Sequence, residues 1–160
     1  MHHPHHFFRI NIGFIINKPI GSSREYNFEN AEYFIPPDIY FNELEGVAIL
    51  SRIQQGLRIY GDFHVNVTAK CARCLQEFQL PLHTNFEEIF TFKTHPLSEN
   101  EQIIPNDGYI DLEKFVSDCL LLQIPINPLC KKDCKGLCSV CGQNLNYRIC
   151  EHYKKTLENN

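Results

Sequence analysis

The spacing of the cysteines constrains this chain more than any other feature of its sequence. The chain has eight cysteines in 160 residues, and five of them lie in PLCKKDCKGLCSVCGQNLNYRICEHY, residues 128–153. A further pair forms the motif Cys71-Ala-Arg-Cys74. The N-terminal sequence has no basic region with a cleavage site, so we expect no export signal. Clustered Cys-x-x-Cys pairs in such a chain indicate metal or redox sites rather than disulfides.

Cys119 is set apart because it falls on the apolar face of a predicted helix, where free cysteines are commonly buried. Seven cysteines and His152 remain, which is enough for two tetrahedral zinc sites. In the preferred division, one site has Cys71, Cys74, Cys130 and Cys134, and the other has Cys138, Cys141, Cys150 and His152. A rival division joins Cys130, Cys134, Cys138 and Cys141, and leaves Cys71, Cys74, Cys150 and His152. Both predict two Zn²⁺ ions per chain.

Other chemistries are less well supported by the sequence. A redox pair at 71–74 would need a helix N-terminus to lower the pKa of its first thiol, but the flanking segments are predicted strands. The sequence contains no GxSxG, phosphate-binding glycine loop or HExxH motif, and saturated cysteine-rich zinc sites are structural. We therefore predict that the chain is not an enzyme.

The remaining histidines are predicted to have no metal role. The cluster at positions 2, 3, 5 and 6 could bind a metal, but we expect a frayed terminus there. His64, His83 and His95 are interpreted as isolated surface or hydrogen-bonded residues.

Alternation of apolar and polar residues predicts an antiparallel β body. Its expected strands cover 8–16, 46–53, 57–70, 78–82 and 86–92. Residues 17–45 are predicted to be loop with one short strand at most, and residues 94–108 a polar loop.

A change to helical period predicts one helix over 111–124, with Asp111 as its N-cap and Pro125 after its end. The expected fold is α+β and mostly β, with an antiparallel sheet or partial barrel. Residues 1–129 would form this body, and residues 130–160 a zinc-binding tail anchored to it in one compact unit.

Charge is distributed unevenly along the chain. Residues 1–129 have a net charge of −7 and residues 130–160 a net charge of +3, from Lys/Arg and Asp/Glu counts. A basic tail suggests an anionic partner such as RNA, with the candidate contacts Lys131, Lys132, Lys135, Arg148, Lys154 and Tyr147. Seven zinc-bound thiolates would offset part of this charge, so a solvated zinc-loop surface is the competing interpretation.

Three stretches resemble the YceD family, the large ribosomal RNA subunit accumulation proteins of bacteria and plastids. They are VTAKCARCLQEF at 67–78, IDLEKFVSDCLLLQIPINPLC at 110–130 and CKGLCSVCGQNLNYRIC at 134–150. The resemblance implies a cytoplasmic, bacterial-type role in processing or accumulation of large-subunit (23S) rRNA, with no known catalysis. Some shorter members keep positions matching Cys130 and Cys134 but lack the rest of the tail, which favours the preferred division. Many members have Cys-x-Cys where this chain has Cys150-Glu151-His152.

Two functions of different classes follow. The first is a ribosome-biogenesis factor that acts on large-subunit rRNA or its precursor, directly or through a ribosomal protein or an rRNA-processing enzyme. The second is a zinc-stabilised protein–protein adaptor without RNA contact. Neither involves a membrane or a small-molecule substrate, and salt dependence of binding distinguishes them.

Overall fold

The computed structural model describes residues 7–35, 39–92 and 102–158. The chain folds into two compact units. The first, here the sheet unit, comprises 1–66 and 81–123, and the second, here the cysteine unit, comprises 67–80 and 124–160. The N-terminal histidines, His95 and most of the predicted loop at 94–108 lie outside the described residues.

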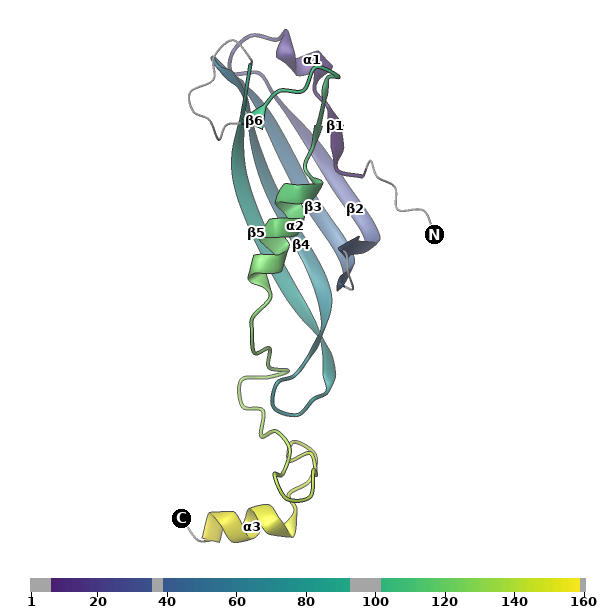
Figure 1. The fold of residues 1–160 in the computed structure, drawn as a ribbon, viewed down its shortest axis with the longest axis vertical. Coiled ribbons are helices and arrows are strands. Elements are labelled where there is room, and N and C mark those ends of the chain that lie inside the picture. The colour runs from purple at the N-terminus through teal and green to yellow at the C-terminus, as the bar shows by residue number, and fades with distance from the viewer. Residues whose placement is uncertain (1–6, 36–38, 93–101, 159–160) are drawn as a thin grey trace. The chain divides into compact units, whose positions relative to one another are not determined.

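One sheet has the strand order β2-β3-β4-β5-β6 and is not closed into a barrel (Figure 1). Its strands are β2 (Ser23–Ile35), β3 (Ile39–Ile53), β4 (Gly56–Lys70), β5 (Glu77–Thr91) and β6 (Gln102–Ile103). Strands β2 and β3 pair antiparallel, whereas the short β6 pairs parallel to β5. A second, antiparallel pair joins β1 (Arg9–Asn11) to β7 (Tyr109–Asp111). The predicted class, mostly β with few helices, is confirmed.

Two predictions for the N-terminal third were wrong. The expected strand at 8–16 stops at Asn11, and α1 (Gly13–Ile16) follows, because the Asn11 side chain accepts a hydrogen bond from the Gly13 amide at 2.9 Å. The expected loop at 17–45 contains β2 and the first part of β3. Strand β2 lies at a sheet edge, so many of its polar side chains are exposed and its apolar alternation is weak.

Helix α2 (Glu113–Gln123) forms close to its predicted place. The Asp111 carboxylate accepts a hydrogen bond from the Glu113 amide at 2.9 Å and so satisfies the first amide of the helix. The predicted N-cap is displaced by one residue, because Leu112 O accepts the first helical hydrogen bond and Asp111 lies before it. Phe115 of α2 contacts the rings of Phe86 and Phe90 on β5. The aromatic core of the sheet unit therefore fixes α2 against the sheet. Cys119 is half-buried rather than fully buried, and burial raises the pKa of its thiol.

Two phenylalanine rings of the core each lie against a glycine on the adjacent strand. A Cβ at Gly46 would lie 2.1 Å from the Phe63 ring, and one at Gly61 would lie 2.5 Å from the Phe86 ring. Because real Cβ atoms do not approach rings so closely, both positions need a residue without a side chain.

The cysteine unit contains the end of the β4–β5 hairpin, a segment mostly of turns, and α3 (Glu151–Glu158). Helix α3 was not predicted, because it is short and mostly polar. The described residues of this unit bury few apolar or thiol side chains, namely Val67, Cys71, Cys74, Cys134, Cys138 and Leu145. Half of that small core consists of the cluster Cys71, Cys74 and Cys134. No helix among the described residues has the length and apolar character needed to span a membrane.

Candidate metal centre

The turn between β4 and β5 carries the first pair of candidate ligands, Cys71 and Cys74. It is closed by two backbone hydrogen bonds, from Cys71 N to Gln76 O at 2.8 Å and from Leu75 N to Cys71 O at 2.9 Å. Leu75 has a positive φ of 59°, which lets the chain reverse within this short span. Ala72 N donates to Pro128 O at 2.8 Å, so the turn is bonded to the segment that carries the next pair.

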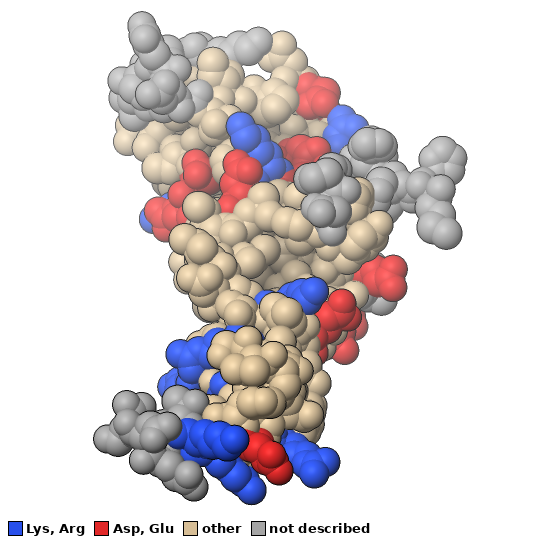
Figure 2. Space-filling model, turned by 60° about the horizontal axis from the view of Figure 1, so that its bottom comes forward, with Lys and Arg blue, Asp and Glu red and all other residues tan. Residues whose placement is uncertain are grey.

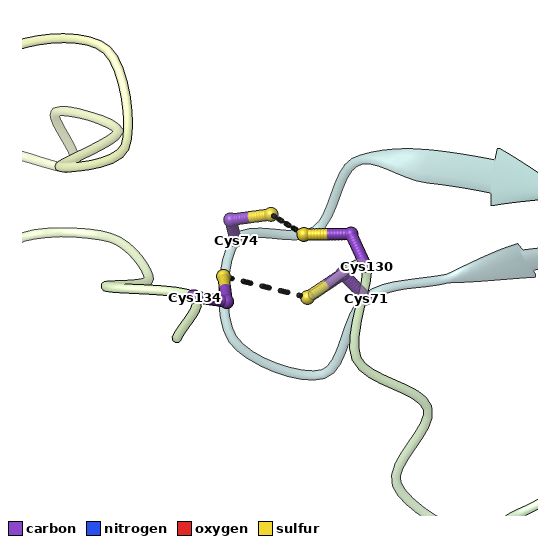
Figure 3. A group of neighbouring side chains, drawn as sticks. All are labelled: Cys71, Cys74, Cys130 and Cys134. Carbon is purple, nitrogen blue, oxygen red and sulfur yellow. Dashed lines mark hydrogen bonds between the residues drawn. The ribbon is translucent and has the colours of Figure 1, made fainter. Parts of the chain in front are cut away.

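Four sulfur atoms converge at this turn (Figure 3). The Sγ atoms of Cys71 and Cys134 are 3.8 Å apart, and those of Cys74 and Cys130 are 3.6 Å apart. A tetrahedral zinc ion with Zn–S bonds of about 2.3 Å places its sulfur ligands about 3.8 Å from one another. All four sulfurs lie within 4.8 Å of one another. The donor atoms of this group, here group 1, therefore fit a tetrahedral metal ion.

Hydrogen bonds in group 1 favour thiolates at two of its positions. Burial raises the pKa of Cys71, but backbone N–H groups outweigh burial and lower that pKa to about 6. Burial also raises the pKa of Cys134, and the Asn146 amide, 3.3 Å from its sulfur, contributes to the net lowering. At Cys130, burial and hydrogen bonds with neighbouring thiols raise the pKa to about 12. Deprotonation of all four thiols would bring four negative charges together, and a bound dication would offset part of that charge.

Cys138, Cys141, Cys150 and His152 form the second cluster, here group 2, with donor atoms within 4.8 Å of one another. A tight turn brings the first two together. Gly142 N donates to Cys138 O at 2.9 Å, and Gly142 has a φ of +71°, where glycine is favoured. Backbone N–H groups of Cys141 and Val140 lower the pKa of Cys138 to about 7. Helix α3 begins directly after Cys150, and His152 is the second residue of this helix.

The structure thus brings together the same residues that the preferred division assigns to each site. The rival division would need Cys130 and Cys134 to join Cys138 and Cys141, but their sulfurs lie instead with those of Cys71 and Cys74. Three cysteines and one histidine, or four cysteines, are donor sets that suit zinc. Ligation of a metal ion itself stays a prediction.

Sequence reasoning missed the residues that surround group 1. Asn146 contacts the Cys134 sulfur and accepts a hydrogen bond from Lys135 N at 2.9 Å. Arg73 donates to the Cys134 carbonyl at 2.9 Å. These side chains hold the loop around the sulfurs. No spacing rule identifies them, because they act through hydrogen bonds that form only in the folded loop.

The candidate RNA contacts lie on the surface of the cysteine unit. The five basic residues are exposed, namely Lys131, Lys132, Lys135, Arg148 and Lys154. Figure 2 shows blue side chains gathered around the end of the chain that contains α3, with few red ones. Tyr147 is 74% exposed, and its hydroxyl is 2.8 Å from the amide nitrogen of Gln76. A groove of about 340 Å³ is lined by residues that include Lys131, Tyr147, Gln76 and Phe78.

Comparisons with known proteins place the chain in a family. Residues 59–159 match the family model "Large ribosomal RNA subunit accumulation protein YceD". A chloroplastic large ribosomal RNA subunit accumulation protein, YCED homolog 1 of Arabidopsis thaliana, is 45% identical over 130 residues, which covers 62% of this chain and 40% of the relative. An uncharacterized protein of Mycobacterium tuberculosis is 30% identical over 94 residues, covering 56% of this chain and 45% of the relative.

The matches cover less than half the length of these curated relatives. No solved structure matches the chain. The family match spans 59–159 and so contains both cysteine groups and α2. The chain therefore belongs to the YceD family of large ribosomal RNA subunit accumulation proteins.

Proposed function

We propose that this chain is a non-enzymatic ribosome-biogenesis factor that holds two Zn²⁺ ions and supports processing and accumulation of large-subunit (23S) rRNA. One observation carries the proposal: the match to an rRNA-accumulation family includes all eight candidate ligands. The partner is the rRNA or its precursor, contacted directly or through a ribosomal protein or processing enzyme. A cytoplasmic location agrees with cysteines that act as metal ligands, because a reducing compartment keeps thiols from forming disulfides.

The two groups have the chemistry of structural sites. Each offers four protein ligands, which would leave zinc without an open position for water or substrate. Bound zinc would supply a cross-link between loop segments and charge compensation for the thiolates. Backbone N–H groups, Asn146 and Arg73 orient those thiolates and their loop. The function of the metal groups in this proposal is to shape the surface of the cysteine unit.

That surface is suited to a single-stranded or looped RNA. Tyr147 presents an exposed ring beside Lys131 at the groove, and its hydroxyl is held by Gln76. Aromatic rings stack on unpaired bases, and neighbouring lysines contact phosphates. Because the ring is anchored at its hydroxyl, stacking would require little reordering of the side chain.

Depletion of the protein in its own cells tests the proposed function. We expect the ratio of mature large-subunit to small-subunit rRNA to fall and unprocessed large-subunit precursor to rise. Expression of the unmodified chain should restore the ratio, and so should Cys119→Ser, because Cys119 belongs to neither metal group. RNA blotting or sequencing of total RNA measures both species. An unchanged rRNA ratio after complete depletion would contradict the proposal.

Direct contact with RNA predicts a specific salt dependence. Replacing Lys132, Lys135 and Arg148 with glutamine should weaken RNA binding. The slope of log Kobs against log salt concentration should become shallower by about 2, because each of the three lost phosphate contacts on a single strand accounts for ~0.7. The matched control replaces Lys18, Arg58 and Lys114, which are charged residues of the sheet unit, and should leave the slope unchanged. Filter binding to a large-subunit rRNA fragment gives both slopes.

The alternative function, a zinc-stabilised protein adaptor, gives a different result in the same assay. An adaptor would reach the rRNA only through a partner protein. The purified chain would then bind the rRNA fragment weakly, and the cysteine-unit variant and the sheet-unit control would bind it equally weakly. Equal slopes for the two variants would therefore reject direct contact and favour the adaptor.

A further inference from the structure

Two histidines that the sequence presents as isolated are neighbours on the exposed face of the sheet unit. Asp62 and His64 alternate with buried residues on β4, so both side chains lie on one face. His83 is exposed on β5, the next strand in the sheet. The His64 and His83 rings are stacked, with centroids 4.2 Å apart and an angle of 17° between their planes. The two residues are therefore not isolated, whereas their interpretation as surface or hydrogen-bonded residues is confirmed.

The carboxylate of Asp62 meets both rings. Its Oδ1 atom is 3.1 Å from Nε2 of His83 and 3.3 Å from Nε2 of His64. Ligands about 2.0–2.1 Å from a metal ion lie about 2.9 Å apart at an octahedral edge and about 3.4 Å apart at a tetrahedral edge. Both separations fall in that interval. Because the two rings are stacked, one of them would turn on binding so that both nitrogen lone pairs point at the ion. The three ligand atoms all lie within 4.8 Å of one another.

A neighbouring hydroxyl orients the carboxylate. Tyr60, two residues before Asp62 on β4, donates to Oδ2 at 3.3 Å and leaves Oδ1 facing the two rings. Metal-binding carboxylates are commonly held in this way by a second hydrogen bond.

We propose that Asp62, His64 and His83 form a third metal site, which takes a first-row divalent transition metal ion. Two imidazoles and one carboxylate suit Zn²⁺, Ni²⁺, Co²⁺ or Fe²⁺. The side chains of His64 and His83 are 63% and 48% exposed, so water fills the remaining coordination positions. With three protein ligands and open access, this site exchanges its ion, unlike the four-ligand cysteine groups. It lies wholly within the sheet unit and does not depend on the proposed rRNA function.

Calorimetric titration of the full, zinc-loaded chain with Ni²⁺ tests the site. The four histidines at positions 2, 3, 5 and 6 are replaced with glutamine in every sample, because their imidazoles would also bind Ni²⁺. We expect one Ni²⁺ per chain, without release of zinc. His64→Gln and His83→Gln should each weaken binding more than about tenfold, the scale on which metal sites lose affinity when a supporting group is removed. The double variant should show no binding.

Arg58→Gln is the matched control, since Arg58 is exposed on the same face of β4 and should leave Ni²⁺ binding unchanged. Both histidines are exposed, so their substitution should preserve the circular dichroism spectrum and the zinc content. Absence of Ni²⁺ binding in the parent chain would overturn the proposal and leave only Asp–His hydrogen bonds. Equal binding by the parent and the H64Q/H83Q variant, or binding matched by zinc release, would overturn it as well.

Discussion

Replacing Cys74 with serine should release one zinc ion and unfold the part of the cysteine unit that group 1 holds together, namely the turn between β4 and β5 and the segment at Pro128. Cys74 belongs to group 1, whose sulfurs make up much of the small buried core of that unit. Structural zinc contributes apparent binding free energies on the order of 10 kcal/mol at neutral pH. That magnitude is comparable to the whole net stability of a domain. Without that ion, the few buried apolar side chains beside group 1 do not offset the cost of ordering this turn and segment. Group 2 keeps its own four ligands and should stay folded.

Amide hydrogen exchange gives this result residue by residue. In Cys74→Ser we expect loss of protection at Cys71, Ala72 and Leu75, whose backbone hydrogen bonds hold the turn and the Pro128 segment together. Cys119→Ser is the control and should keep both zinc ions and all three protected amides. Preserved protection of these amides in Cys74→Ser, with zinc content unchanged, would show that group 1 does not hold the turn.

Replacing Cys150 with serine should have the second largest effect, and a more local one. Cys150 belongs to group 2, which closes only the short stretch from Cys138 to His152. One zinc ion should be lost, and protection should vanish at Cys138, Gly142 and Lys154, whose amide hydrogen bonds lie in or next to this stretch. Group 1 retains its ligands, so the turn amides at Cys71 and Ala72 should stay protected.

Comparison of the two variants decides how the ligands are divided. In the rival division Cys74 and Cys150 share one ion, so the two substitutions would remove the same zinc and expose the same amides. In the preferred division they expose different sets. Identical exchange patterns in Cys74→Ser and Cys150→Ser would therefore contradict the placement of Cys74 in group 1 and Cys150 in group 2.

The cysteine groups could be predicted because metal ligation restricts both residue type and spacing. The two Cys-x-x-Cys pairs each set two sulfurs at one turn, and only a few combinations can then complete a tetrahedron. Strand β4 was predicted for a similar reason: its alternation of buried and exposed residues is nearly unbroken.

Other features depend on contacts between segments distant in sequence. Strand β2 lies at a sheet edge and has too few buried residues for a clear alternating pattern. Helix α1 follows from the Asn11 side chain, which ends the strand early. The pairing of His64 with His83 depends on the register of β4 against β5. No single-sequence pattern specifies that register.

We predict that two separate groups of four ligands each hold one zinc ion. The intact mass of the chain under native conditions tests this prediction most directly. The chain is first dialysed against a weak chelator, which strips exchangeable sites. The unmodified chain should carry two zinc ions, Cys74→Ser and Cys150→Ser one each, and the double variant none. Every cysteine should remain reduced. A metal-free chain whose mass is lowered by two hydrogens for each disulfide would contradict the assignment of both groups, and so would a single zinc ion in the unmodified chain.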